Sequence, residues 1–429
     1  MRLLEKLKGN RLAISGANYS LSSASLSIFS MLVSLLNMRW LGPSELGVWQ
    51  SLCIVNAYIP FLQLGVQSAL NVELPLLLGK SEDEKAKTFI ANSLSLSIAV
   101  TTLIACFGVI STFIVWSKGL GINYILGVIA VTALNVANSI AYHFIARYRS
   151  SMSFDILSRI IRIQLFVAIG CIPMIYYFGF WGLLIYSSVP HLVYALLLLK
   201  KSPFNEVKPY ITKSDMGYLT KRGIVLMLYG QTSTAIKTLP QWFLLQFGGT
   251  VFVGLFSPAL AIGNVLNLIP SQLSQFIVPQ MGYKYAQTGQ AKELWPLVKR
   301  ILIFMPMVIL PFSVALYFSL PWLISTMFPK YIDAISAMQI MCLGFVFSCS
   351  SMTINFLYTI KAFKEATTIL ATEALSYLLF PVLTFKILGV SLLPAIAIGV
   401  SMTYLTVFMI TFIVMKITLF KNKYNPVNC

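Results

Sequence analysis

The chain has 429 residues, of which 58% are hydrophobic and only 10% are charged. A soluble domain carries about 25% charged residues, so this composition excludes an ordinary soluble protein and indicates a protein that crosses a membrane many times. The net charge of +18 does not indicate a nucleic-acid partner, because the basic residues are spread among the connections between apolar runs.

A run of about 20 apolar residues is long enough to cross a bilayer as a helix. Almost no residues remain outside such runs, so no soluble domain is expected. The predicted fold is therefore an all-α integral membrane protein with twelve transmembrane helices. In chain order they cover residues 12–36, 47–73, 88–116, 122–146, 160–178, 180–199, 221–246, 250–280, 300–326, 334–360, 367–387 and 391–415.

The distribution of Lys and Arg predicts the orientation of the chain. Of the 31 basic residues, 26 fall in the termini and connections on the N-terminal side of the membrane, and four fall in the opposite connections. Cytoplasmic connections carry the basic excess in membrane proteins. Both termini are therefore expected in the cytoplasm.

The sequence also predicts an internal repeat. The longest connection, residues 200–222, lies between spans six and seven and divides the chain into a first six-helix bundle (1–199) and a second six-helix bundle with a short cytoplasmic tail (223–429). Residues 41–87 consist of a Gly turn, an apolar helix with amide side chains and a charged loop. Residues 247–300 repeat this order with an offset of about 207 residues. Two pseudo-symmetric bundles around a central cavity are expected.

The second span carries a stripe of amide side chains at Asn56, Gln63, Gln67 and Asn71. Their spacings of 7, 4 and 4 place them on one helical face. One interpretation is hydrogen bonding between helices, and the other is a face that lines a polar cavity, which four amides on one face favour. Pro60 is expected to open the helix, and Glu73, off the stripe, is expected at the cytoplasmic interface rather than in the interior.

The seventh span carries Lys237, with Gln231 and Gln241 on the same side of the helix. Lys237 lies 15 residues beyond Arg222, or roughly 22 Å along a helix, which places it near the middle of the bilayer. A lysine there is costly unless it faces water, an acid or an anionic ligand. A structural ion pair with Glu373 of span eleven is the alternative.

Further candidate binding residues lie on other spans or at their ends. Arg39, at the outer end of span one, breaks the charge bias, and Arg147 and Arg149 mark the cytoplasmic end of span four, where simple anchoring is the alternative. The polar residues on the later spans are Asn264, Asn267, Gln275 and Asn355.

No signal for enzymatic chemistry is present. The two histidines, His143 and His191, are not at metal-ligand spacing, the six cysteines form no CxxC pair, and no Walker A, GxSxG or HExxH motif occurs. We therefore expect no catalytic residues, no metal site and no cofactor, and a transporter rather than an enzyme.

Three segments carry a resemblance to a known family: LGPSELGVWQSL…FLQLGVQSAL, VGLFSPALAIGNVLNLIPSQLSQFIVPQM and FPKYIDAISAMQIMCLG. They resemble the Wzx-type O-antigen and polysaccharide flippases of the multidrug/oligosaccharidyl-lipid/polysaccharide (MOP) exporter superfamily. The resemblance covers the whole chain and implies two six-helix bundles around a cationic cavity. The implied activity moves an undecaprenyl-diphosphate-linked oligosaccharide from the cytoplasmic to the periplasmic leaflet of the bacterial inner membrane by alternating access.

This resemblance suggests roles for the candidates. Lys237 and Arg39 would meet the diphosphate, the amides would bind sugars, Glu373 would carry a coupling proton or sodium ion, and Arg147 and Arg149 would lie at the cytoplasmic entrance. A polysaccharide polymerase and a chain-length regulator would be partners. Two other functions stay open: a cation-coupled exporter of small molecules from the same superfamily, and a scaffold of a glycan assembly complex.

Overall fold

The structure is a computed structural model that describes residues 2–200, 202–288, 290–350, 353, 354, 356, 357, 360 and 362–420. For residues 2–13, parts of 268–286 and residue 388 it describes the backbone only. Every regular element within these ranges is a helix. The α-helices are α1 (Arg2–Trp40), α2 (Pro43–Cys53), α3 (Val66–Gly79), α4 (Asp83–Ser117), α5 (Ile122–Ser150), α6 (Phe154–Phe178), α7 (Phe180–Lys200), α8 (Lys213–Ile236), α9 (Leu239–Thr288), α10 (Trp295–Met327), α11 (Ile335–Phe345), α13 (Phe363–Leu388) and α14 (Leu392–Phe420).

Five short 3₁₀ helices connect or interrupt these elements. They are η1 (Ile54–Ala57), η2 (Ile59–Gln63), η3 (Ala291–Leu294), η4 (Pro329–Ala334) and η5 (Val346–Ser350).

The described helices include ten stretches that are long and apolar enough to cross a membrane. One of them, Lys213–Asn267, has 55 residues, or about 80 Å if straight. It is interrupted after Ile236 and at Gly249, whose φ of 75° is not helical, so it has the length for two crossings. A bent pair, Pro43–Gln63 with Val66–Gly79, supplies one more. The all-α membrane fold is confirmed, with ten such stretches among the described residues, or eleven with the bent pair. The predicted count of twelve is reached if Lys213–Asn267 crosses twice, and the end of the predicted span 334–360 lies partly outside the described residues.

Contacts divide the chain into two units, and the second unit includes a short segment from the first part of the sequence. Unit 1 comprises Met1–Leu41 and Leu52–Thr232, and unit 2 comprises Gly42–Ser51 and Ser233–Cys429. Most of α2 therefore packs with the second part of the chain, although it begins the second span. Conversely, nearly all of α8 packs with the first part.

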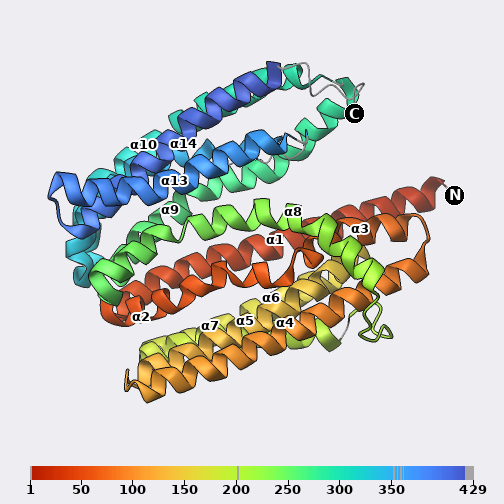
Figure 1. The fold of residues 1–429 in the computed structure, drawn as a ribbon, viewed down its shortest axis with the longest axis horizontal. Helices are drawn as coiled ribbons and strands as arrows, with labels where there is room; N and C mark the ends of the chain where they lie inside the picture. Colours follow the sequence, from red (N-terminus) through yellow and green to blue (C-terminus); the bar gives the residue numbers. More distant parts are fainter. Residues whose placement is uncertain are drawn as a thin grey trace. The chain divides into compact units, whose positions relative to one another are not determined.

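In unit 1, α4 packs on α5, α5 on α7, α7 on α6 and α6 on α1, and Figure 1 shows α4 to α7 lying side by side. A second layer of contacts fixes α3 and α8. Leu70 of α3, Phe89 of α4 and Leu219 of α8 are all buried in one apolar cluster. This cluster holds the polar face of α3 at a defined position between α4, α5 and α8.

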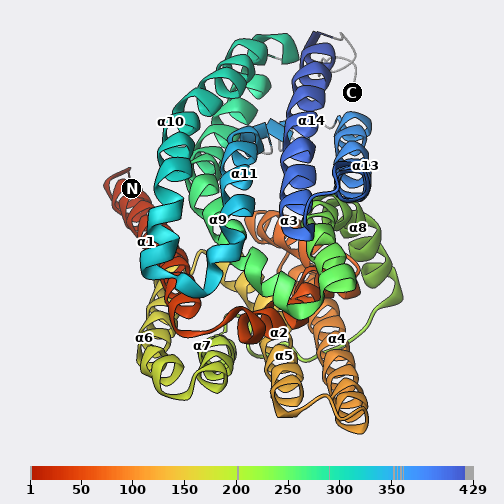
Figure 2. The same ribbon diagram turned by 90° about the vertical axis from the view of Figure 1, so that its left-hand side faces the viewer.

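In unit 2, α14 is the central helix and contacts α9, α10, α11 and α13; Figure 2 shows it beside α11 and α13. Polar side chains join these helices where the surroundings are apolar. Thr384 of α13 donates to the carbonyl of Ala395 in α14 over 2.7 Å, and Ser401 of α14 donates to the carbonyl of Ile340 in α11 over 3.2 Å. These bonds satisfy hydroxyls that hydrocarbon could not.

The second span is broken near its middle. From Ile54 to Gln63 the α-helix gives way to η1 and η2, with Pro60 in the first turn of η2, as the sequence predicts. The chain then bends by 54° before α3 begins. Leu64 and Gly65 at the bend both have positive φ. A Cβ at Gly65 would overlap the backbone of Gly223 in α8, so only glycine permits α8 to lie against the break.

Candidate functional site

A polar cavity of about 180 Å³ lies in unit 1, beside the break in the second span. Its walls come from η2, α3, α5 and α8, and none of the residues that line it is charged. Four predicted binding residues, Gln63, Gln67, Asn71 and Gln231, are brought together here. The complete lining is Pro60, Gln63, Gly65, Gln67, Ser68, Asn71, Tyr142, Met227 and Gln231.

The two buried glutamines also bond to neighbouring helices. Gln63 Nε2 donates to Ser139 Oγ of α5 over 3.4 Å. Gln67 Nε2 donates to Ser97 Oγ of α4, and its Oε1 accepts from Ser93 Oγ over 3.3 Å. The two interpretations of the amide stripe therefore apply together, because the same side chains join helices and line the cavity. Their orientation is fixed by at least one hydrogen bond each.

The polar face of α5 completes this network and was missed as a set by the sequence analysis. Asn135 Nδ2 donates to Asn56 Oδ1 over 2.8 Å, and His143 Nδ1 lies 2.8 Å from Ser93 Oγ. Asn135, Ser139, His143 and Arg147 follow one another at intervals of four residues, which puts them on one face. That spacing was the available signal, but Ser139 alone looks like an ordinary packing residue.

The two arginines predicted at the cytoplasmic entrance lie in different surroundings. Arg149 is exposed and donates to the hydroxyl of Tyr19 over 2.6 Å. Arg147 is only 1% exposed. Its Nη1 lies 3.4 Å from Ser202 Oγ and 3.5 Å from the carbonyl oxygen of Phe204, both in the connection that follows α7. Arg147 is therefore covered by the connection between the sixth and seventh spans.

The expectation for Glu73 was wrong. Its side chain is buried, with 8% of the residue exposed, and its Oε1 accepts a hydrogen bond of 2.9 Å from Arg222 Nε. The reason is the packing of α8 on α3, which brings Arg222 over a position that is off the amide stripe but not at the surface. A paired carboxylate tolerates this burial, whereas an isolated one would not.

In unit 2, Lys237 lies in the interruption between α8 and α9. Its Nζ is 4.0 Å from Glu373 Oε1 of α13, while Ser233 Oγ donates to Glu373 Oε2 over 3.2 Å. The structural ion pair considered from the sequence is thus present. Glu373 is buried, but 42% of the Lys237 side chain is exposed. The ammonium group can therefore meet a further acceptor without leaving its carboxylate.

The remaining candidates do not gather at one point within either unit. Arg39 and Asn264 are exposed, and Gln241 is half-buried. Asn267 accepts a hydrogen bond of 2.8 Å from Ser348 Oγ. The side chain of Gln275 and the whole of Asn355 lie outside the described residues.

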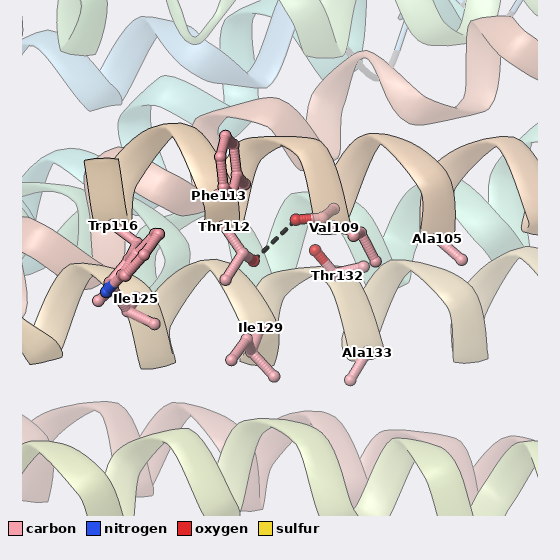
Figure 3. Close-up of a pocket in the computed structure, with 10 residues that line it drawn as sticks. Ala105, Val109, Thr112, Phe113, Trp116, Ile125, Ile129, Thr132 and Ala133 are labelled. Carbon is pink, nitrogen blue, oxygen red and sulfur yellow. Dashed lines mark hydrogen bonds between the residues drawn. The ribbon is translucent and has the colours of Figure 1, made fainter. Parts of the chain in front are cut away.

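An apolar groove of about 720 Å³ runs between α4 and α5. Figure 3 shows Val109, Phe113 and Trp116 of α4 on one side and Ile129 of α5 on the other. The two threonines in the groove bond to carbonyl oxygens of their own helices, Thr112 to Gly108 and Thr132 to Val128, each over 2.7 Å. With its hydroxyls satisfied, the groove suits a hydrocarbon chain. Over the described part of the chain, no group of three or more His, Cys, Asp and Glu residues could hold a metal ion.

Comparison with known proteins gives the fold. No protein-family model and no curated protein matches the sequence, but solved structures do. An inward-facing multidrug resistance MATE family transporter of the MOP superfamily has a TM-score of 0.76 at 14% identity, over 93% of this chain and 98% of that chain. An outward-facing one has a TM-score of 0.65 at 14% identity, over 95% of each chain.

A MOP superfamily transporter from Pyrococcus furiosus, described as having a binding pocket of reverse polarity, has a TM-score of 0.57 at 14% identity, over 95% of this chain and 93% of that one. The chain therefore has the fold of the MATE transporters of the MOP superfamily.

Proposed function

We propose that this protein is a flippase for an oligosaccharide linked to undecaprenyl diphosphate, working by alternating access in the bacterial inner membrane, with both termini in the cytoplasm. The observation that carries the proposal is the uncharged, amide-lined cavity within a bundle of membrane-spanning helices. Structural neighbours in inward-facing and outward-facing conformations support the alternating-access part.

The cavity chemistry matches a sugar better than a cation. Gln63, Gln67, Asn71 and Gln231 offer amide donors and acceptors, and no carboxylate is among the lining residues. A sugar ring carries hydroxyls in many directions, each able to donate and accept. A cationic drug would gain little from neutral amides, since desolvating its charge would go uncompensated.

The charged pair of unit 2 suits the diphosphate. In our mechanism, protonation of Glu373 removes the negative partner of Lys237 and frees the ammonium for phosphate oxygens. Deprotonation restores the ion pair of 4.0 Å and releases the head group. The protonation state of Glu373 would thereby control binding of the head group. Arg39, which is exposed at the end of α1, would meet the head group at the periplasmic side.

The apolar groove between α4 and α5 fits the same substrate. The hydroxyls of its two threonines are both hydrogen-bonded, and none of the residues that line it is charged. A prenyl chain could therefore lie there while the sugars occupy the amide cavity. A polysaccharide polymerase and a chain-length regulator would then act on the product.

A cation-coupled exporter of small molecules is the second candidate. Two observations favour it. The structural neighbours include a transporter described as a multidrug resistance protein, and a cavity of about 180 Å³ is small for more than one sugar. Expression in a bacterium that lacks its own polysaccharide flippase separates the two. Restored surface polysaccharide supports the flippase, and drug resistance without restored polysaccharide supports the exporter.

A further inference from the structure

Arg147 is a buried cation whose charge has no acidic partner within ion-pair distance. The three ion pairs among the described residues do not include it, and Glu206 of the following connection acts on it only at longer range. Its two hydrogen bonds, to Ser202 and to the Phe204 carbonyl, are 3.4 and 3.5 Å long. Bonds of that length are at the weak limit for N–H donors.

The unpartnered atoms of Arg147 form one edge of its guanidinium group. Nε and Nη2 are both buried and have no hydrogen-bond partner in the described structure. Two parallel N–H groups on one edge match two oxygens of a phosphate or carboxylate. The ring of Phe144, 4.7 Å from the guanidinium carbon, covers a face of the group and offers this edge no hydrogen-bond acceptor.

A second unpartnered group lies one helical turn away. His143 is fully buried, and its Nδ1 is engaged by Ser93, but its Nε2 has no partner in the part of the chain that the structure describes. The interval of four residues puts His143 and Arg147 on the same face of α5. Because Ser93 Oγ donates to Gln67 Oε1, His143 Nδ1 carries the ring hydrogen. Its Nε2 is therefore an acceptor, which matches the hydroxyl of a protonated phosphate better than a carboxylate.

We propose that Arg147 and His143 form a binding site for a phosphate-type oxyanion at the C-terminal end of α5, closed over by the connection from Ser202 to Glu206. The ligand displaces the long bonds to Ser202 and Phe204 and fills the Nε–Nη2 edge. Glu206 is the acid whose charge acts on Arg147, so its negative charge weakens binding of the anion. The site does not depend on the proposed flippase activity, because the source of the phosphate can be a lipid head group or a free phosphate compound.

The test uses the full-length protein in detergent and inorganic diphosphate as the probe, with binding measured by calorimetry and by the shift in thermal unfolding. Arg147→Lys keeps the charge but removes the paired donors, so we expect about tenfold weaker binding or more. Arg159→Lys, at an exposed arginine of α6, is the matched control and should bind as the wild type does. Glu206→Gln should tighten binding.

Two outcomes overturn the proposal: no binding by the wild type, or equal binding by wild type and Arg147→Lys. If Arg147→Lys does not fold, His143→Gln replaces it, with weaker binding expected and unchanged binding counting against the site. Competition identifies the source. Displacement of the probe by undecaprenyl phosphate in detergent indicates a lipid head group, and displacement by inorganic phosphate alone indicates a free compound. Because no transport is measured, failure of the flippase assay leaves this result standing.

Discussion

Gly47 and Gly254 contact each other reciprocally within unit 2. A Cβ at Gly47 would overlap the carbonyl of Thr250, and a Cβ at Gly254 would overlap the carbonyl of Pro43. In the sequence repeat, Pro43 is equivalent to Thr250 and Gly47 is equivalent to Gly254, each at an offset of 207 residues. A contact in which each partner meets the equivalent residue of the other is the signature of two-fold symmetry. At this crossing of α2 and α9, the sequence repeat is also a structural repeat.

We expect Gly47→Ala and Gly254→Ala each to destabilise the protein by about 1–3 kcal/mol, because the added methyl group has only backbone to displace. Gly79→Ala and Gly230→Ala are matched controls, since both are helical and a Cβ there meets nothing within 4 Å. Thermal unfolding in detergent measures the effect. Equal melting temperatures for the two sets would show that α2 and α9 are not in close contact.

The pair of Glu73 and Arg222 should be energetically coupled. Arg222→Gln leaves a mostly buried carboxylate without its partner, whereas Glu73→Gln with Arg222→Gln removes both charges. Because Arg222 is 58% exposed at its side chain, we expect a coupling on the order of 1 kcal/mol. A double-mutant cycle of unfolding free energies checks it, and additive single effects would exclude the interaction.

Gln67→Leu should abolish transport and lower the unfolding free energy by about 1–3 kcal/mol, because the change removes the bonds to Ser93 and Ser97 and leaves their hydroxyls with fewer partners. Gln164→Leu is the control, since Gln164 is also buried but does not line the cavity. Transport is compared at equal amounts of folded protein. Retained transport by Gln67→Leu would remove this side chain from the binding site.

Lys237→Ala should abolish transport without loss of protein when Glu373→Gln is introduced with it, so that no buried charge is left unpaired. Glu373→Gln alone should keep Lys237 free and make substrate binding independent of pH. The wild type should bind its substrate more tightly at low pH, where Glu373 is protonated. Binding measured across a pH series decides this, and the same pH dependence in Glu373→Gln would exclude Glu373 as the coupling residue.

Some of this arrangement could be predicted from the sequence because it depends on local periodicity. A spacing of four places Gln67 and Asn71 on one face of α3 whatever surrounds them, and the apolar runs predict the helices that cross the membrane. The burial of Glu73 and of Arg147 could not be predicted in the same way. Each depends on a distant segment, α8 in one case and the connection from Ser202 in the other, that packs over the residue.

The bend at Leu64 and Gly65 was predictable only in part. Pro60 indicates an interruption, but its position and angle depend on the close approach of Gly223, which lies more than 150 residues away. The apolar groove between α4 and α5 has no sequence signature, since its residues look like any membrane-facing surface.

The central claim is tested most directly by reconstitution into liposomes that contain undecaprenyl-diphosphate-linked oligosaccharide, with movement across the bilayer followed by a membrane-impermeant reagent that modifies the sugar. We predict protein-dependent movement that is lost in Gln67→Leu and retained in Gln164→Leu. Absence of movement by the wild type, together with proton-driven uptake of a small organic cation by the same liposomes, would contradict the flippase and identify an exporter.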